Sequence, residues 1–228
     1  MRQNKYGFQP PITVQDPRPG LCYPIDGASW VSPRGDLAYV PVPKCVSLRM
    51  TQWCEANGWH KENYHDQIVP AHRRFLVLLR DPRERWVSAM KQWINEAGYD
   101  WSQLNQQSRD IIRRHIICDE HTMLQHRFLV GLRLAQIDAV DVSHDRRHTS
   151  DRIQEIMARH GHHCRLDPNE DRERNPEIAE LWQWVDDIEV AGRLQNAYAD
   201  DYWLRYFLLD SELPDELRLA REPTPGDR

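Results

Sequence analysis

Short apolar runs, separated by mixed segments, stand out in the middle of the chain. Residues 37–42 (LAYVPV) and 75–79 (FLVLL) are short and continuous, and the second run is bounded by charged residues. Such runs are typical of strands that are buried in a parallel sheet. Residues 137–142 (IDAVDV) are predicted to form a third strand.

Helical spacing of apolar residues marks the segments between these strands. Ser47 is a favourable cap for a helix that runs to about residue 57, with Gly58 at its end. After RDPRE at 80–84, a second helix is predicted because its apolar residues form one face: Trp86, Met90, Trp93, Ile94 and Ala97. Further helices are expected over 106–118, 120–134, 149–160 and 176–207. In the last of these, packing is the predicted role of three residues spaced three apart, Tyr198, Asp201 and Leu204.

The order of these elements indicates an α/β fold. Strands that alternate with helices favour a three-layer sandwich around a mostly parallel central sheet. Residues 1–35 are rich in Pro, Gly and Asp. We expect them to form an extended lead-in, because proline removes a hydrogen-bond donor and fixes φ. The α/β domain is placed at 36–210, and a loosely held tail at 211–228.

Composition narrows the range of partners and compartments. The net charge is −5 and no basic run occurs, which argues against binding to duplex DNA. There is no stretch of about 18 apolar residues, so no membrane association is expected, and the start of the chain lacks a signal-peptide core. The five cysteines show no CxxC spacing, so neither a disulfide framework nor a metal site is predicted: Cys22, Cys45, Cys54, Cys118 and Cys164. The chain is therefore expected to be cytoplasmic, with free thiols.

Lys44 lies where the first predicted strand ends and a helix is about to begin. Backbone N–H groups at a helix N-terminus are unpaired, and the helix dipole adds partial positive charge there. A lysine at such a place completes a cradle for phosphate. The glycines of a Walker A loop are absent. Taken alone, Lys44 would by default be interpreted as a solvated surface lysine.

Arg80 repeats this arrangement after the second predicted strand. It is placed at the carboxyl end of the strand, where open α/β sheets bind ligands. Ser88 follows about two turns into the next helix. The guanidinium offers a fork of donors that matches phosphate, and a hydroxyl adds one more. The alternative is a local salt bridge between Arg80 and Asp81, with Ser88 an ordinary polar helix residue.

Together these segments resemble a known family, the PAPS-dependent sulfotransferases (PAPS is 3′-phosphoadenosine 5′-phosphosulfate). PKCVS at 43–47 resembles their 5′-phosphosulfate loop, and RDPRERWVSAM at 80–90 is similar to their 3′-phosphate motif. HTMLQHRFL at 121–129 resembles a His/Gln segment of the carbohydrate sulfotransferases. ERNPEI and LQNAYADDYWL, at 173–178 and 194–204, are similar to their C-terminal signature. The resemblance extends over about residues 37–207 and implies a P-loop-like version of the sandwich.

The resemblance implies roles for individual residues. Lys44 matches the lysine that contacts the 5′-phosphate and the transferred sulfuryl group. Arg80 and Ser88 match the pair that holds the 3′-phosphate of PAPS and of its product PAP. Where the family usually has small hydroxyl residues, this chain has Leu48 and Arg49, and Arg49 offers a replacement charge. The rest of the loop would contribute to binding through Cys45, Val46 and Ser47.

Sulfuryl transfer resembles phosphoryl transfer, and it needs a group that accepts the proton of the attacking hydroxyl. Glu62 and His65 lie between the two phosphate motifs, where several sulfotransferases place a base. His121 is a rival through the HTMLQ resemblance. For each of the three, a solvated polar side chain is the alternative interpretation.

The function expected from the sequence is transfer of a sulfuryl group from PAPS to a hydroxyl acceptor, either a small molecule or a glycan. One alternative is a catalytically silent PAP-binding, nucleotide-binding or structural protein that keeps the fold. The other is a nucleotide kinase, against which the missing Walker A glycines argue.

Overall fold

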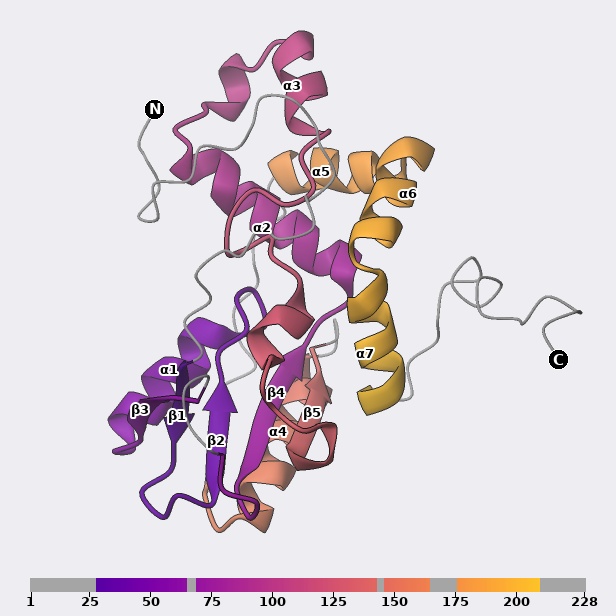
Figure 1. The fold of residues 1–228 in the computed structure, drawn as a ribbon. Coiled ribbons are helices and arrows are strands. Elements are labelled where there is room, and N and C mark those ends of the chain that lie inside the picture. The colour runs from indigo at the N-terminus through magenta and orange to yellow at the C-terminus, as the bar shows by residue number, and fades with distance from the viewer. Residues whose placement is uncertain (1–27, 65–68, 143–145, 165–175, 210–228) are drawn as a thin grey trace, which may run out of the picture.

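A five-stranded sheet organises the lower part of the molecule (Figure 1). The computed structural model describes residues 28–64, 69–142, 146–164 and 176–209. The strands lie in the order β3-β1-β2-β4-β5. Their bounds are β1 (Ala28–Val31), β2 (Leu37–Val40), β3 (His60–Asn63), β4 (Arg74–Leu79) and β5 (Ile137–Asp141).

Seven α-helices and three short 3₁₀ turns accompany the sheet within the described residues. The helices are α1 (Ser47–Ala56), α2 (Pro82–Glu96), α3 (Gln106–Ile112), α4 (Arg146–Arg159), α5 (Pro176–Asp186), α6 (Ile188–Ala197) and α7 (Ala199–Leu209). The 3₁₀ turns are Trp101–Gln103, Gln125–Leu129 and Leu134–Gln136. The fold is therefore mixed α/β, as the sequence predicted.

The three apolar runs form the parallel half of the sheet. β2 pairs with β4 and β4 pairs with β5, both in parallel, so that Phe75 lies between Ala38 and Ile137. Every residue from Phe75 to Leu79 is buried. A strand covered on both faces has no polar face, which is why these strands appear in the sequence as continuous apolar runs.

The other half of the sheet is antiparallel. β1 pairs with β2 on one side and with β3 on the other, and both pairings are antiparallel. The sheet is therefore mixed, and the prediction of a mostly parallel sheet was wrong. β1 lies within the segment that was expected to be an extended lead-in. β3 has the sequence HKEN and mostly exposed side chains, as suits a short edge strand, and it carries no apolar run.

Two helix predictions also failed. The segment 120–134, all of it described, contains no α-helix; it holds a 3₁₀ turn over Gln125–Leu129 and the first residue of another, Leu134–Gln136. The backbone N–H groups of Gln125 and His126 donate to the carboxylate of Asp201 in α7, whereas an α-helix over this segment would pair them with its own carbonyl oxygens. The predicted long helix over 176–207 is divided into α5, α6 and α7. Asp187 ends the first piece because its side chain caps α6.

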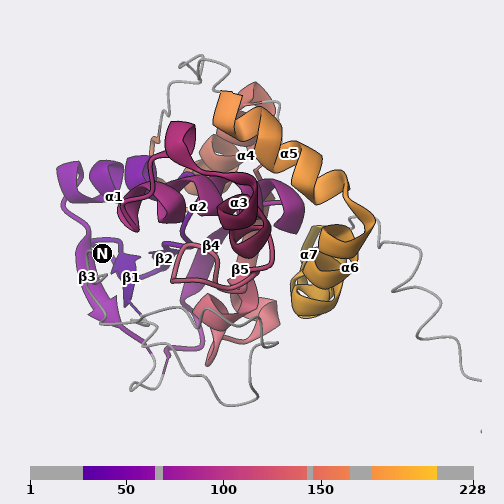
Figure 2. The same ribbon diagram turned by 90° about the horizontal axis from the view of Figure 1, so that it is seen from above.

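Buried apolar residues form two hydrophobic clusters. One surrounds the sheet, and the other surrounds Trp86, Met90 and Trp93 on α2. Figure 1 shows α2 leaving the sheet and running into an upper group of helices that includes α3 and α5. In the view from above, α6 and α7 lie together at one side of the molecule (Figure 2). α7 packs against β5.

Candidate anion-binding site

Lys44 and Arg80 follow neighbouring parallel strands. Val40, at the end of β2, pairs with Val77 of β4. Lys44 comes four residues after β2 ends, and Arg80 comes directly after β4. The carboxyl ends of parallel strands lie at the same edge of a sheet, so the structure brings the two basic residues to one edge.

The loop of residues 43–46, called here the Lys44 loop, has an unusual backbone. Lys44 and Val46 are the two described non-glycine residues with positive φ, at 67° and 60°. Left-handed backbone is unfavourable for a β-branched residue such as Val46, and strain of this kind is concentrated at functional sites. Val46 is also the N-cap of α1, and no side chain caps that helix. An uncapped helix N-terminus is a favourable place for an anion.

Arg85 of α2 lies beneath this loop. Its side chain is fully buried, and Nε donates a 2.9 Å hydrogen bond to the carbonyl oxygen of Pro43. Nη1 donates to the carbonyl oxygen of Met123, and Nη2 is buried with no partner in the described part of the chain. No described carboxylate forms an ion pair with this guanidinium. A buried cation without an anionic partner is costly, so an anion close to this guanidinium would stabilise it.

The sequence interpretation missed Arg85, although one signal was present. Ala89 and Trp93 lie four and eight residues after Arg85, and both are buried apolar positions on α2. Residues at this spacing share a helix face. An arginine aligned with apolar neighbours on a helix is therefore a sign of a buried guanidinium.

Arg80 lies between β4 and α2, and Ser88 lies about two turns into α2, as the sequence predicted. The local ion pair of Arg80 is made with Glu84, one turn further on, by an Nε–Oε2 contact of 3.1 Å. Asp81 instead caps α2, and its carboxylate accepts from the backbone N–H groups of Arg83 and Glu84. Ser88 is half-buried on α2.

A second arginine that the sequence interpretation missed joins the ends of β4 and β5. Arg205 of α7 is mostly buried and donates to Asp81, at 3.2 Å, and to Asp141, at 2.8 Å. Asp81 follows β4, and Asp141 is the last residue of β5. Arg205 therefore fixes α7 to the same edge of the sheet that carries Lys44 and Arg80.

Gln125 connects the Lys44 loop to Arg80. Its Oε1 accepts a 2.9 Å hydrogen bond from the backbone N–H of Arg80 and a 3.4 Å bond from the thiol of Cys45. Its Nε2 donates a 2.8 Å bond to the carbonyl oxygen of Arg80. Burial raises the pKa of Cys45 to about 11, and the nearby charges of Arg85 and Arg80 oppose this only in part. The thiol is therefore neutral and able to donate.

Asp201 holds the backbone around Gln125. Its carboxylate is fully buried and accepts from the backbone N–H groups of Gln125 and His126, at 2.7 and 2.9 Å, and from the His126 ring at 3.0 Å. Tyr198 is buried and donates its hydroxyl hydrogen to the carbonyl oxygen of Thr122. The predicted packing role thus describes Tyr198 only in part, and Asp201 is an anchor for a neighbouring segment.

Glu62 lies on β3, the edge strand of the sheet, where its backbone pairs with Ser29 of β1. Its carboxylate contacts Arg73 at 2.6 Å and His60 at 2.8 Å. Burial alone would raise the pKa of Glu62, but hydrogen bonds from His60 and Arg73 outweigh it and hold the pKa below its usual value. Among the described residues, the ion pairs of Glu62 are therefore with Arg73 and His60 and not with Lys44, Arg80 or Arg85.

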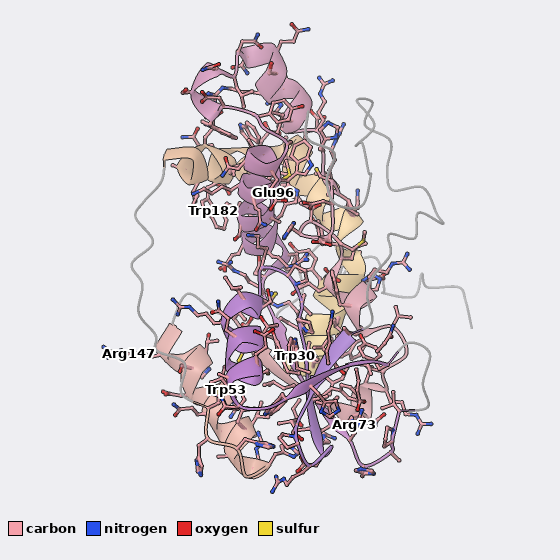
Figure 3. The ribbon with its side chains drawn as sticks, turned by 90° about the vertical axis from the view of Figure 1, so that its left-hand side faces the viewer. Trp30, Trp53, Arg73, Glu96, Arg147 and Trp182 are labelled. Atoms are coloured by element: carbon pink, nitrogen blue, oxygen red, sulfur yellow. The ribbon has the colours of Figure 1, made fainter. Side chains whose placement is uncertain are left out.

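His121 lies beside the C-terminal part of α2. Its Nδ1 is 2.9 Å from Asp119, and its Nε2 accepts from the Gln92 amide at 2.9 Å. Gln92 is seven residues beyond Arg85, or roughly 10 Å along the helix. Figure 3 shows Glu96, in the same part of α2, well away from Arg73 near the base of the sheet. His65, the third candidate base, lies outside the described residues.

The surroundings of His121 also contain metal-ligand types. Ligand atoms of Glu96, Asp119 and His121 lie within 4.8 Å of one another. The Gln92 amide nitrogen already contacts both Glu96, at 2.5 Å, and His121. Hydrogen bonds through Gln92 thus account for this cluster without an ion.

The described cysteines are free and buried: Cys45, Cys54, Cys118 and Cys164. This agrees with the prediction of free thiols for these four, and Cys22 lies outside the described residues. Burial raises the pKa of Cys164 to about 12, and it also raises the pKa values of Cys54 and Cys118. These thiols are therefore poor nucleophiles.

Comparison of the chain with protein-family models, curated proteins and solved structures found no match. Among the described helices, none has the length and apolar character that crossing a bilayer requires. Function is therefore inferred from the edge of the sheet where Lys44, Arg80 and Arg85 gather.

Proposed function

We propose that the protein binds PAPS at the carboxyl edge of β2 and β4 and transfers its sulfuryl group to a hydroxyl acceptor, a small molecule or a saccharide. The observation that carries this proposal is the buried guanidinium of Arg85, which has an unpartnered Nη2 and lies directly beneath the Lys44 loop. A doubly phosphorylated nucleotide would supply an anion for this guanidinium. Lys44 would contact the 5′ end of PAPS, and Arg80 with Ser88 would contact the 3′-phosphate.

These residues fit the demands of sulfuryl transfer. The acceptor oxygen attacks sulfur, the bond from sulfur to the 5′-phosphate oxygen breaks, and the acceptor proton passes to a base. Negative charge grows on the leaving phosphate, so a cation at that oxygen stabilises the transition state. Lys44 is the residue we assign to this role. Arg85 supports it by adding positive charge under the same loop.

The parallel half of the sheet supports a P-loop-like core. β2 and β4 are each followed by a loop and then by a helix, α1 and α2. This is the arrangement in which α/β proteins bind phosphates, outside the carboxyl ends of the strands. The antiparallel strands β1 and β3 then extend this core at its β2 edge.

A second candidate is a nucleotide-binding protein without transferase activity. The surroundings of two candidate bases favour it, because Glu62 is held in ion pairs with Arg73 and His60, and His121 contacts Gln92, roughly 10 Å along α2 from Arg85. In that case PAP would bind at the same edge with no group to accept the proton. A nucleotide kinase is disfavoured by the missing Walker A glycines.

Calorimetry and a transfer assay test these proposals together. The wild-type chain should bind PAP more tightly than ATP, and labelled sulfate from PAPS should reach at least one member of a panel of saccharides and small hydroxyl compounds. Binding of PAP without transfer to any acceptor would support the silent binding protein. No binding of PAP would refute both proposals, and tighter binding of ATP would support the kinase.

A further inference from the structure

Gln125 pairs with Arg80 in the way that a neighbouring strand would. An amide side chain carries one acceptor oxygen and one donor nitrogen, which match the N–H and C=O groups of a single backbone residue. Gln125 uses both, at 2.9 and 2.8 Å, to pair with Arg80 just beyond the end of β4. The second lone pair of Oε1 accepts from Cys45 in the Lys44 loop. One fully buried side chain thus contacts both basic loops.

The segment that carries Gln125 is itself held from two helices. Asp201 of α7 accepts from the backbone N–H groups of Gln125 and His126. Arg85 of α2 donates to the carbonyl oxygen of Met123 in the same segment. Gln125 therefore has little freedom, and a rigid support is what a precise binding geometry requires.

From these contacts we infer that Gln125 is a positioning residue that fixes the distance between the Lys44 loop and Arg80. Both ends of one bisphosphate ligand are then bound together. The inference rests on the proposed function. Two weak sites held at the correct spacing bind a bivalent ligand far better than either site alone, because the second contact becomes intramolecular. Loss of Gln125 should therefore weaken bivalent binding and leave the individual contacts intact.

The variant Gln125→Met tests this, with Gln136→Met as its matched control. Gln136 is also buried, and its Nε2 also donates to two backbone carbonyls, those of Pro70 at 2.9 Å and Arg73 at 3.0 Å. These lie at the amino end of β4, away from the basic loops. The ligands are PAP, adenosine 5′-monophosphate and adenosine 3′-monophosphate. Q125M should raise the Kd of PAP about tenfold or more, with less than about threefold change for either monophosphate. Q136M should change none of the three.

Hydrogen exchange supplies a readout that needs no ligand. In Q125M the backbone N–H of Arg80 loses its acceptor, so its exchange should be faster than in wild type or Q136M. If Q125M does not fold, Cys45→Ala removes only the link to the Lys44 loop and should weaken PAP binding while sparing both monophosphates. Equal losses for PAP and the monophosphates, or unchanged PAP affinity in either variant, would overturn the inference. If the wild type binds no PAP, the proposed function fails. Unchanged exchange of the Arg80 backbone N–H in Q125M would separately refute the positioning role of Gln125.

Discussion

Replacing Arg85 by methionine should abolish tight PAP binding while leaving the free protein nearly as stable as before. The two hydrogen bonds from the guanidinium to Pro43 and Met123 contribute about 1.5–3 kcal/mol each, so their loss costs roughly 3–6 kcal/mol. Removing the buried charge recovers several kcal/mol of desolvation, and removing the unpartnered Nη2 recovers about 1–3 kcal/mol. These terms nearly cancel, so R85M should change the free energy of unfolding by less than about 2 kcal/mol.

The effect on the ligand should be large. A charge-assisted contact to phosphate contributes about 1.5–3 kcal/mol, so R85M should raise the Kd of PAP roughly ten- to a hundred-fold. In urea unfolding, PAP at 100 times the wild-type Kd should stabilise the wild type by about 2.7 kcal/mol. The same concentration should stabilise R85M by about 1.4 kcal/mol or less.

Arg74→Met is the matched control for R85M. Arg74 forms two hydrogen bonds to Asp138, at 3.0 and 2.7 Å, at the amino end of β4. R74M should lower stability without changing the stabilisation by PAP. If R85M proves strongly destabilised while its PAP affinity equals that of the wild type, Arg85 is a structural residue, and the reasoning about an anion beside it is refuted.

Three further predictions concern single groups. Lys44→Ala should lower kcat because negative charge grows beside Lys44 in the transition state. Arg80→Ala should raise KM by an amount equivalent to about 1.5–3 kcal/mol, with little change in kcat. Equal losses of kcat in both variants would contradict the assigned geometry. Glu62 has a lowered pKa in the folded protein, so its contribution to stability is present above its unfolded pKa and is lost as the pH falls through the folded value. Glu62→Gln should therefore reduce stability at neutral pH, the difference should shrink as the pH falls below the unfolded pKa of about 4.3 and vanish below the folded one, and transfer activity should persist; loss of transfer with unchanged stability would instead identify Glu62 as the base. Native alkylation at pH 8 should spare the four described cysteines, because burial raises their pKa values, to about 11 for Cys45; rapid labelling of Cys45 would contradict its buried hydrogen bond to Gln125.

The elements that the sequence predicted are those with a local signature. β4 was found because a strand buried on both faces must be apolar throughout, and α2 was found because Asp81 and Pro82 start it and its apolar residues share one face. The placement of Lys44 and Arg80 at the carboxyl edge followed directly, since each comes just after such a strand.

The elements that the sequence did not predict depend on distant partners. β3 is a polar strand of four residues, and it exists because β1 pairs along its full length. The segment after Asp119 is not a helix, because Asp201, 76 residues beyond Gln125, accepts its backbone N–H groups. No local pattern in 60–63 predicts the pairing with β1, and none in 120–134 predicts the contact with Asp201.

For the candidate site, the sequence by itself determined which groups are present, and the tertiary structure decided which of them meet. The positions of Lys44 and Arg80, each after a buried strand, could be predicted from adjacent residues alone. Arg85 contacts a carbonyl 42 residues away, and Gln125 contacts a thiol 80 residues away. Polar groups such as these acquire their partners only when packing excludes water, because in the unfolded chain water satisfies every donor and acceptor. The clustering of buried polar side chains at one edge of the sheet is therefore a property of the folded molecule.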